Sequence, residues 1–179
     1  KISDKIDINS WDVSNVTNMS YMFKWGGSLY SELNEWDVSA VIEMQWMFTD
    51  IEFFNSDITS WDTSSLEDSH FMFKTAIGFD QDLSSWQLSS IKTMQRMVAN
   101  LPEFNSDLSN WDTSSALKIS KLFWQDVSFN IDLSGWDTSR VVNALKTFGG
   151  ACSFDCSCIE SWDMSSVVKG GPPHICGCP

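Results

Sequence analysis

An aspartate directly after a tryptophan is the most frequent pairing in this chain that could bind a ligand. Six such aspartates recur at intervals of 25 residues, with one rung missing at Gln87 and a last interval of 26: Asp12, Asp37, Asp62, Asp112, Asp137 and Asp163. If each Trp points inward from a short strand, the Asp after it points outward, and the carboxylates form a row with about 4.8 Å between rungs. Calcium prefers oxygen ligands at about 2.3–2.6 Å, so one ion could bridge two rungs. The row predicts an acidic face that binds a cation, with calcium as the candidate, or docks a ligand.

The same row also has a structural interpretation. An Asp side chain readily accepts a hydrogen bond from backbone nearby in the chain, and a repeated coil would repeat that Asx turn. A second acidic row, four residues before each Trp, favours the same turn-capping role: Asp7, Glu32, Asp57, Asp82, Asp107 and Asp132. Both interpretations of the first row stay open at this point.

The cysteines lie together after position 151, at Cys152, Cys156, Cys158, Cys176 and Cys178. With His174 they offer six potential zinc ligands, although none has the C-x2-C spacing that zinc sites commonly use. The other interpretation is a disulfide-bonded cap on an extracellular array, in which one of the first three pairs with one of the last two. An odd number leaves at least one cysteine free or bonded to another molecule. We expect Cys158 in an inward-facing column and Cys156 outside it.

Two further features could carry function. Asn15 and Asn18 each begin a glycosylation sequon, and both are expected to be exposed. Trp25, Trp46 and Trp124 fall outside the 25-residue column. Such aromatic side chains either stack on a sugar or anchor a partner, or they fill gaps between coils.

Catalysis finds little support in the residue pattern. The two histidines, His70 and His174, lie in different contexts, and the chain holds no phosphate-binding loop and no G-x-S-x-G motif. The acidic residues repeat in every coil, whereas a glycosidase pair occupies one place. The sequence predicts a protein that is not an enzyme and needs no cofactor, calcium being the one candidate ion.

The element that must position these residues is an internal repeat. Seven tryptophans mark it: Trp11, Trp36, Trp61, Trp86, Trp111, Trp136 and Trp162. Ser follows each Trp by three residues and an apolar residue follows by five, while Phe recurs at twelve and at eighteen residues after most of them. A unit of 25 residues cannot bury its apolar side chains alone, but stacked copies cover one another.

Each repeat reads as a short strand followed by a short helix or 3-10 segment. Alternation over residues 58–63 predicts the strand, and the apolar spacing over 16–23 predicts the helical segment. The run 64–67, Ser-Ser-Leu-Glu, has the form of a capping box. The sequence therefore predicts a leucine-rich-repeat-like solenoid of about seven coils over 1–168, with a Cys-rich C-terminal cap over 151–179 that overlaps the last coil.

Charge narrows the choice of partners. The chain of 179 residues carries 11 basic and 24 acidic residues, a net charge of −13. This balance argues against nucleic acid, which needs Lys and Arg on its phosphates, and against anionic lipid. The absence of a run of 18 apolar residues predicts no membrane insertion. The first ten residues resemble the end of an earlier repeat rather than a signal peptide, so we expect a piece of a longer protein.

The repeat pattern resembles one family of surface proteins. L-x-x-W-x-V-x-x-V is a variant of the leucine-rich-repeat consensus. The stretches WDVSNVTNMSYMF (11–23) and FNSDITSWDTSS (54–65) resemble the 25-residue repeats of BspA-like leucine-rich repeat surface proteins, which also occur in mycoplasma lipoproteins. The resemblance runs from about Ile8 to Val168.

This resemblance implies a secreted or surface-attached array without enzymatic activity. The function to expect is a non-enzymatic extracellular or cell-surface module for adhesion or for binding a protein or glycan. The alternative is a structural subunit that associates with itself, end to end, into an extracellular fibre.

Overall fold

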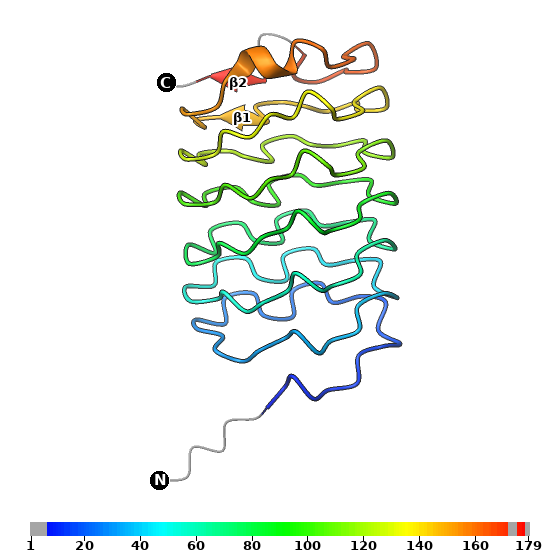
Figure 1. Cartoon of the computed structure of the whole chain (residues 1–179), viewed down its shortest axis with the longest axis vertical. Coiled ribbons are helices and arrows are strands. Elements are labelled where there is room, and N and C mark those ends of the chain that lie inside the picture. The colour runs from blue at the N-terminus through cyan, green and yellow to red at the C-terminus, as the bar shows by residue number, and fades with distance from the viewer. Residues whose placement is uncertain (1–6, 172–174, 178–179) are drawn as a thin grey trace.

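The computed structural model describes residues 7–171 and 175–177, and in it the chain winds into a column of stacked coils (Figure 1). Within these residues, regular secondary structure is limited to strand β1 (Phe148–Gly149), the 3-10 helix η1 (Cys156–Ile159) and strand β2 (Cys176–Gly177). Strands β1 and β2 pair in parallel. Single-residue parallel bridges join neighbouring coils seven residues after each Trp, at Asn18, Glu43, Asp68, Thr93, Lys118, Asn143 and Lys169.

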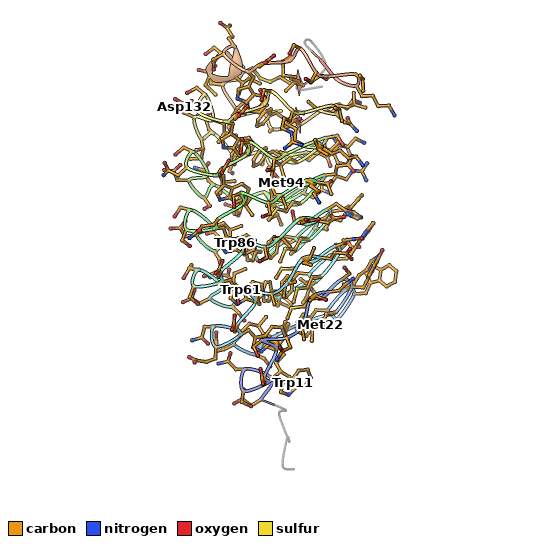
Figure 2. All side chains as sticks on the ribbon, turned by 90° about the vertical axis from the view of Figure 1, so that its right-hand side faces the viewer. Trp11, Met22, Trp61, Trp86, Met94 and Asp132 are labelled. Atoms are coloured by element: carbon orange, nitrogen blue, oxygen red, sulfur yellow. A yellow bond between two sulfur atoms is a disulfide. The ribbon has the colours of Figure 1, made fainter. Side chains whose placement is uncertain are left out.

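The repeated tryptophans stack on one another in successive coils from Trp36 to Trp86 and from Trp111 to Trp162, and Figure 2 shows Trp61 and Trp86 one above the other. The indole centroids of Trp36 and Trp61 lie 6.4 Å apart with the rings inclined by 2°, and later neighbours repeat this at 5.9–6.2 Å. From Trp36 onward the column is buried. Each indole is also anchored through its polar atom, because Nε1 donates to the backbone carbonyl three residues before the preceding Trp at 2.8–3.1 Å.

Two phenylalanine columns form a further part of the core, which also holds columns of Leu, Ile, Met and Val. Phe48 and Phe54 face each other within one coil at 4.0 Å between ring centroids. Phe73 and Phe79 repeat the pair in the next coil at 4.1 Å, and Phe48 stacks on Phe73 across coils at 5.4 Å. Because the same residue type recurs at the same height in successive coils, rings stack without a break from Phe54 to Phe154 in one column. In the other column Val98 interrupts the rings.

The segment expected to be helical forms an inter-coil ladder instead. Alternate N–H groups donate to the next coil, as when Tyr21 donates to the carbonyl of Gln45 and Phe23 donates to that of Met47, at 2.9 and 3.0 Å. The N–H groups between them donate within the coil to the carbonyl three residues earlier. An α-helix directs its N–H groups along its own axis, so it could not supply the bonds that hold one coil to the next.

Positive φ angles make this alternation possible. Eleven non-glycine residues have them: Tyr21, Trp25, Trp46, Asp50, Phe71, Thr75, Arg96, Asn100, Lys121, Gln125 and Lys146. They occupy two positions of the repeat, ten and fourteen residues after the Trp. Such a conformation costs about 1–3 kcal/mol for a residue with a side chain, so packing and inter-coil hydrogen bonds must compensate for it.

The segment expected to be a strand keeps the alternation of side chains. Trp61 and Thr63 are buried and Asp62 is exposed. Coil-to-coil bonding here uses a side chain, because the Thr63 hydroxyl donates to the carbonyl of Gln87 and accepts from its N–H, both at 3.0 Å.

Asp126 is a carboxylate placed in an otherwise apolar column of the core. Its side chain is completely buried, and Oδ1 accepts from the N–H of Leu101 at 2.7 Å. Oδ2 is buried without a hydrogen-bond partner. Desolvation, the largest effect, raises the pKa of Asp126 well above its usual value, while the backbone hydrogen bonds oppose the rise.

No helix among the described residues is long and apolar enough to cross a bilayer.

Replacing Trp111 with Phe tests the indole anchor. The substitution removes the 2.9 Å hydrogen bond to the carbonyl of Leu83, which keeps its bond from the N–H of Trp86. We expect the free energy of unfolding to fall by about 1–2 kcal/mol in urea titrations. Trp25→Phe is the matched control, since Trp25 is 71% exposed. Equal stability of the two variants would contradict the anchoring role.

Asp126 predicts a loss of stability at high pH. A carboxyl whose pKa is raised on folding contributes its stability in full below its unfolded pKa, and this is lost as pH rises through the folded pKa. Denaturant midpoints should therefore fall as pH rises above the usual pKa of an aspartate. Asp126→Asn should flatten that slope, because an amide stays neutral and its oxygen still accepts from Leu101. Asp80→Asn, an exposed change, should leave the slope as it is; an unchanged slope in Asp126→Asn would refute the assignment.

Candidate functional site

The aspartates that follow the tryptophans are exposed, and each caps its own turn. In every one, Oδ1 accepts a hydrogen bond from the N–H of the Ser two residues on, at 2.9–3.1 Å. In Asp12, Asp37 and Asp112 the hydroxyl of that Ser donates to the same oxygen at 2.6–2.7 Å. This geometry is the Asx turn that one interpretation of the sequence proposed.

The same hydrogen bonds determine the charge state of the row. The Ser39 hydroxyl and then the Ser39 N–H lower the pKa of Asp37, and the pKa values of Asp12, Asp62 and Asp137 are lowered in the same way. For Asp163 the Ser165 N–H is the larger cause of the lowered pKa and the hydroxyl the second. Repulsion from the preceding rung acts the other way and is the smallest of the effects on Asp37 and Asp62. The caps therefore keep a row of like charges ionised without a counter-ion.

The second acidic row behaves in the same manner. Oδ1 of Asp57 accepts from the N–H of Thr59 at 3.0 Å, and the turn recurs at Asp7, Asp82, Asp107 and Asp132. Glu32 differs, since it lines a groove of about 280 Å³ with Tyr30 and Phe53. Across residues 7–171 and 175–177, no three His, Cys, Asp or Glu side chains are grouped so as to hold a metal ion. The cation-binding interpretation of the first row stays a prediction.

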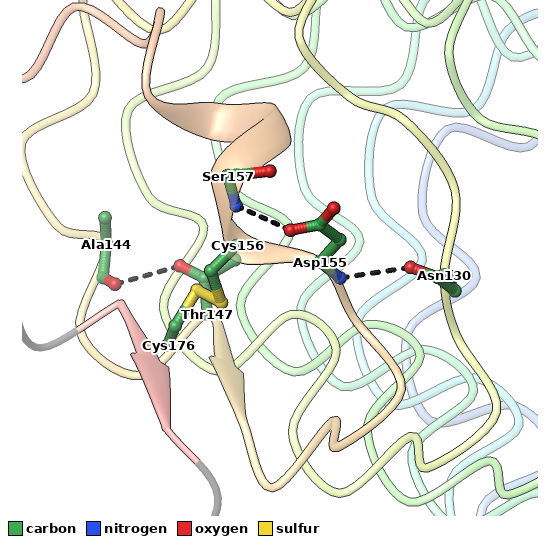
Figure 3. The surroundings of a disulfide bond; sticks show 7 residues. All are labelled: Asn130, Ala144, Thr147, Asp155, Cys156, Ser157 and Cys176. Atoms are coloured by element: carbon green, nitrogen blue, oxygen red, sulfur yellow. Dashed lines mark hydrogen bonds between the residues drawn. A yellow bond between two sulfur atoms is a disulfide. The ribbon is translucent and has the colours of Figure 1, made fainter.

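The cysteine cluster contains a disulfide between Cys156 at the start of η1 and Cys176 in β2 (Figure 3). Asn130 of the coil before supports this end of the chain, because its Oδ1 accepts from the N–H of Asp155 at 3.0 Å. Asp155 in turn caps η1 through the N–H of Ser157 at 2.9 Å. Cys152 is also disulfide-bonded, whereas Cys178 and His174 lie outside the described residues.

Cys158 does not occupy the inward-facing column that the sequence predicted for it. Ile159 takes that place: it is buried, and its carbonyl accepts the Trp162 N–H at 3.1 Å. The expectation was wrong because the last interval is 26 residues, and the shifted position is the last residue of η1. Cys158 is a free thiol, partly buried against the core. Desolvation is the main cause that raises the pKa of Cys158, which makes the reactive thiolate less accessible.

Both sequon asparagines are exposed, as predicted. Asn18 is the more constrained, since its Nδ2 donates to Glu43 at 2.6 Å and its Oδ1 accepts from the Ser20 N–H at 2.8 Å. Asn15 contacts Ser14 at 3.3 Å.

The most distinctive surface is a stack of aromatic rings ten residues after successive tryptophans. The sequence singled out Trp46 and its neighbour Trp25 as candidates for partner binding or for packing, but it did not predict that the rings stack. Tyr21 stacks on Trp46 at 6.1 Å and 8°, and Trp46 stacks on Phe71 at 4.0 Å and 6°. Lys24 lies with Nζ 3.8 Å from the centroid of Trp46 and 4.2 Å from that of Trp25. We call Tyr21, Lys24, Trp25, Trp46 and Phe71 the aromatic face.

Two of the tryptophans outside the column therefore belong to this face rather than to the core. Trp25 is 71% exposed and Tyr21 53%. Trp46 is partly buried, and its Nε1 donates to Nε2 of His70 at 3.1 Å. His70 then donates through Nδ1 to Asp68 at 2.7 Å, so both of its ring nitrogens are engaged. The third, Trp124, lies further along the column beneath Arg96 and Lys121.

Comparison with known proteins connects the chain to one family. The family described as "Mycoplasma protein of unknown function, DUF285" has a model that matches residues 1–109 and, in a second overlapping match, residues 83–171. No curated protein and no solved structure matches the chain.

Substitutions at Asp62 separate the cap from a cation site. Asp62→Asn keeps an oxygen for the Ser64 N–H, so its melting temperature should stay near that of the parent protein. Asp62→Ala removes the acceptor and should melt a few degrees lower. Millimolar calcium should shift none of the three. A calcium-dependent rise in the parent that disappears in Asp62→Asn would instead establish the cation site.

Proposed function

We propose that this chain, which belongs to that family of mycoplasma proteins of unknown function, is a non-enzymatic module, extracellular or on the cell surface, that binds a partner protein or glycan. The observation that carries the proposal is the aromatic face. Large exposed rings are costly to leave in water, and rings held rigidly in a stack lose little conformational entropy when a partner covers them.

We assign the fold to the leucine-rich-repeat type of solenoid, and the repeats to the BspA-like kind. Supporting this assignment are the 25-residue period, the parallel bridges between successive coils and the buried apolar columns. In a solenoid each coil contacts only its neighbours, so surface side chains at one position of the repeat line up into long rows. Rows of this kind suit the binding of extended partners.

A location outside the cell agrees with the disulfide of Cys156 and Cys176. Disulfides persist in oxidising surroundings such as those of secreted and surface proteins. A non-enzymatic role agrees with the periodicity of the chemistry, because the two acidic rows recur from coil to coil and their aspartates have Oδ1 engaged in turns. A catalytic centre needs one place with unlike groups held together.

The second candidate is a subunit that associates end to end into an extracellular fibre. The indole of Trp11 favours it, being 46% exposed where the later indoles of the column are buried. A partner coil could cover that ring as Trp61 covers Trp36. The free thiol of Cys158 offers a covalent link between molecules.

The adhesion proposal is tested by the double variant Tyr21→Ser, Trp25→Ser. Retention of the fluorescently labelled protein on cultured epithelial cells should fall at least tenfold, because the variant removes the two most exposed rings of the aromatic face. Ile77→Ser with Val127→Ser is the control, since these side chains are also apolar and are 57% and 47% exposed. Equal losses in the two double variants, or a parent protein that is not retained, would count against the proposal.

Light scattering distinguishes the fibre. The adhesion module should remain monomeric at all concentrations, with and without reductant. Growth of the scattering mass with concentration, reversed by Trp11→Ser, would favour the fibre.

A further inference from the structure

Basic residues gather on one part of a strongly acidic protein. Arg96, Lys121 and Lys146 stand ten residues after successive tryptophans, in the same row as the aromatic face, and Lys118 and Lys169 stand in the row of inter-coil bridges. We call these five residues the basic ladder. The row that begins with Tyr21, Trp46 and Phe71 therefore changes from aromatic to basic residues halfway along the column, and its last three members are cations.

No carboxylate neutralises the basic ladder among the described residues. The ion pairs between lysine and carboxylate in this part of the chain use other lysines. Lys74 meets Asp50 at 3.4 Å, and Lys92, in the same coil as Arg96, meets Glu67 at 2.5 Å. The segments of the later coils that carry the ladder, 92–100, 117–125 and 142–150, contain no Asp or Glu at all.

The cations are close enough to affect one another. Desolvation is the first cause that lowers the pKa of Lys121, and repulsion from Arg96 and then Lys146 lowers it further. At a rung spacing of about 4.8 Å, like charges repel by roughly 1 kcal/mol in water and by more where solvent is excluded. An anion that bridges the rungs would relieve this repulsion.

A shallow cleft provides a place for such an anion. It has a volume of about 260 Å³ and is lined by Phe71, Gln95, Arg96, Ser120, Lys121 and Leu145. Gln95 donates to the hydroxyl oxygen of Ser120 at 2.7 Å, which fixes two polar groups between the cations. Aromatic rings hold the cations in place: the Arg96 guanidinium lies 5.2 Å from the centroid of Phe71, and Lys121 Nζ lies 4.8 Å from that of Trp124.

We propose that the basic ladder binds a sulfated polysaccharide laid along the column axis. This inference deepens the proposed function by naming a class of glycan. It rests on the cations of the basic ladder, and the cleft shares only Phe71 with the aromatic face.

Three features favour a thin polyanion over other anionic partners. The ladder is narrow and runs along one row, which matches a single chain bearing negative groups at regular intervals. The acidic rows elsewhere and the net charge of −13 repel a broad anionic surface such as a bilayer or a DNA duplex. The rings of Phe71 and Trp124 are each faced by a cation, which leaves less of them for stacking with the bases of a single strand.

The test compares two triple variants that remove the same charge. Arg96→Gln, Lys121→Gln, Lys146→Gln dismantles the ladder, and Gln is compatible with its backbone since Gln125 already adopts a positive φ of 64°. Lys74→Gln, Lys92→Gln, Arg140→Gln is the matched control, since none of the three residues belongs to the basic ladder or to the aromatic face. The probe is a size-defined heparin decasaccharide, and titration calorimetry at two salt concentrations measures its affinity.

We expect the ladder variant to bind the decasaccharide at least tenfold more weakly and with a shallower salt dependence, because fewer counter-ions are released. The control variant should stay within about twofold of the parent, at unchanged salt dependence. Far-ultraviolet dichroism and melting curves establish that both variants remain folded.

Three outcomes would overturn the proposal. One is that the parent does not bind the decasaccharide, and another is that the control loses as much affinity as the ladder variant. The third is that single-stranded DNA of equal charge, or phosphatidylserine vesicles, bind the parent as tightly as the decasaccharide does. A failed adhesion assay with an intact heparin result, or the reverse, distinguishes this proposal from the proposed function.

Discussion

The structure depends on one contact, repeated between coils, from the indole N–H to the backbone carbonyl of the coil before. A column of leucines in place of the tryptophans would also be buried. Each of those carbonyls would then accept one hydrogen bond, from the backbone N–H that it already accepts within its own coil. The indole adds a directional bond 2.8–3.1 Å long to a ring that also stacks. Both interactions require the next indole to be one coil away at the same height. The 25-residue interval is therefore a physical constraint on the chain.

The sequence predicted the parts of this arrangement that depend on the period alone. The order of the stacked rings follows from counting, and so does the exposure of Asp62 between the buried Trp61 and Thr63. The capping role of the aspartates was one of two interpretations and needed coordinates to show the bond from Ser64. The prediction for Cys158 was wrong because a 25-residue period does not reveal where the one additional residue of the last interval is accommodated.

The sequence could not predict the backbone of the segment that was expected to be helical. Apolar residues spaced by three and four are typical of a helix face, and Trp46 and Phe71 are residues that rarely adopt positive φ. Hydrogen bonds between coils decide the backbone conformation of this segment. An isolated segment of this length cannot form them until a neighbouring coil is present. The local pattern favours a helix, and the stack overrides that preference.

The same reasoning explains why the aromatic face and the basic ladder do not stand out among the recurring residues of the sequence. Positions of the repeat that hold the column together tolerate few residue types, so they stand out by repetition, as the Trp, Asp and Phe rows do. The position ten residues after the Trp points outward and changes from Tyr21 and Trp46 to Arg96 and Lys121 along the column. The variation at this position suggests its role, because a stack that needs no particular side chain there leaves the row available for recognition.

Figure 2 places Met22, the neighbour of Tyr21, and Asp132 of the acidic turns on opposite sides of the column. A negatively charged chain approaching the molecule is then repelled on one side and attracted on the other, so the fold orients a polyanion before any close contact forms.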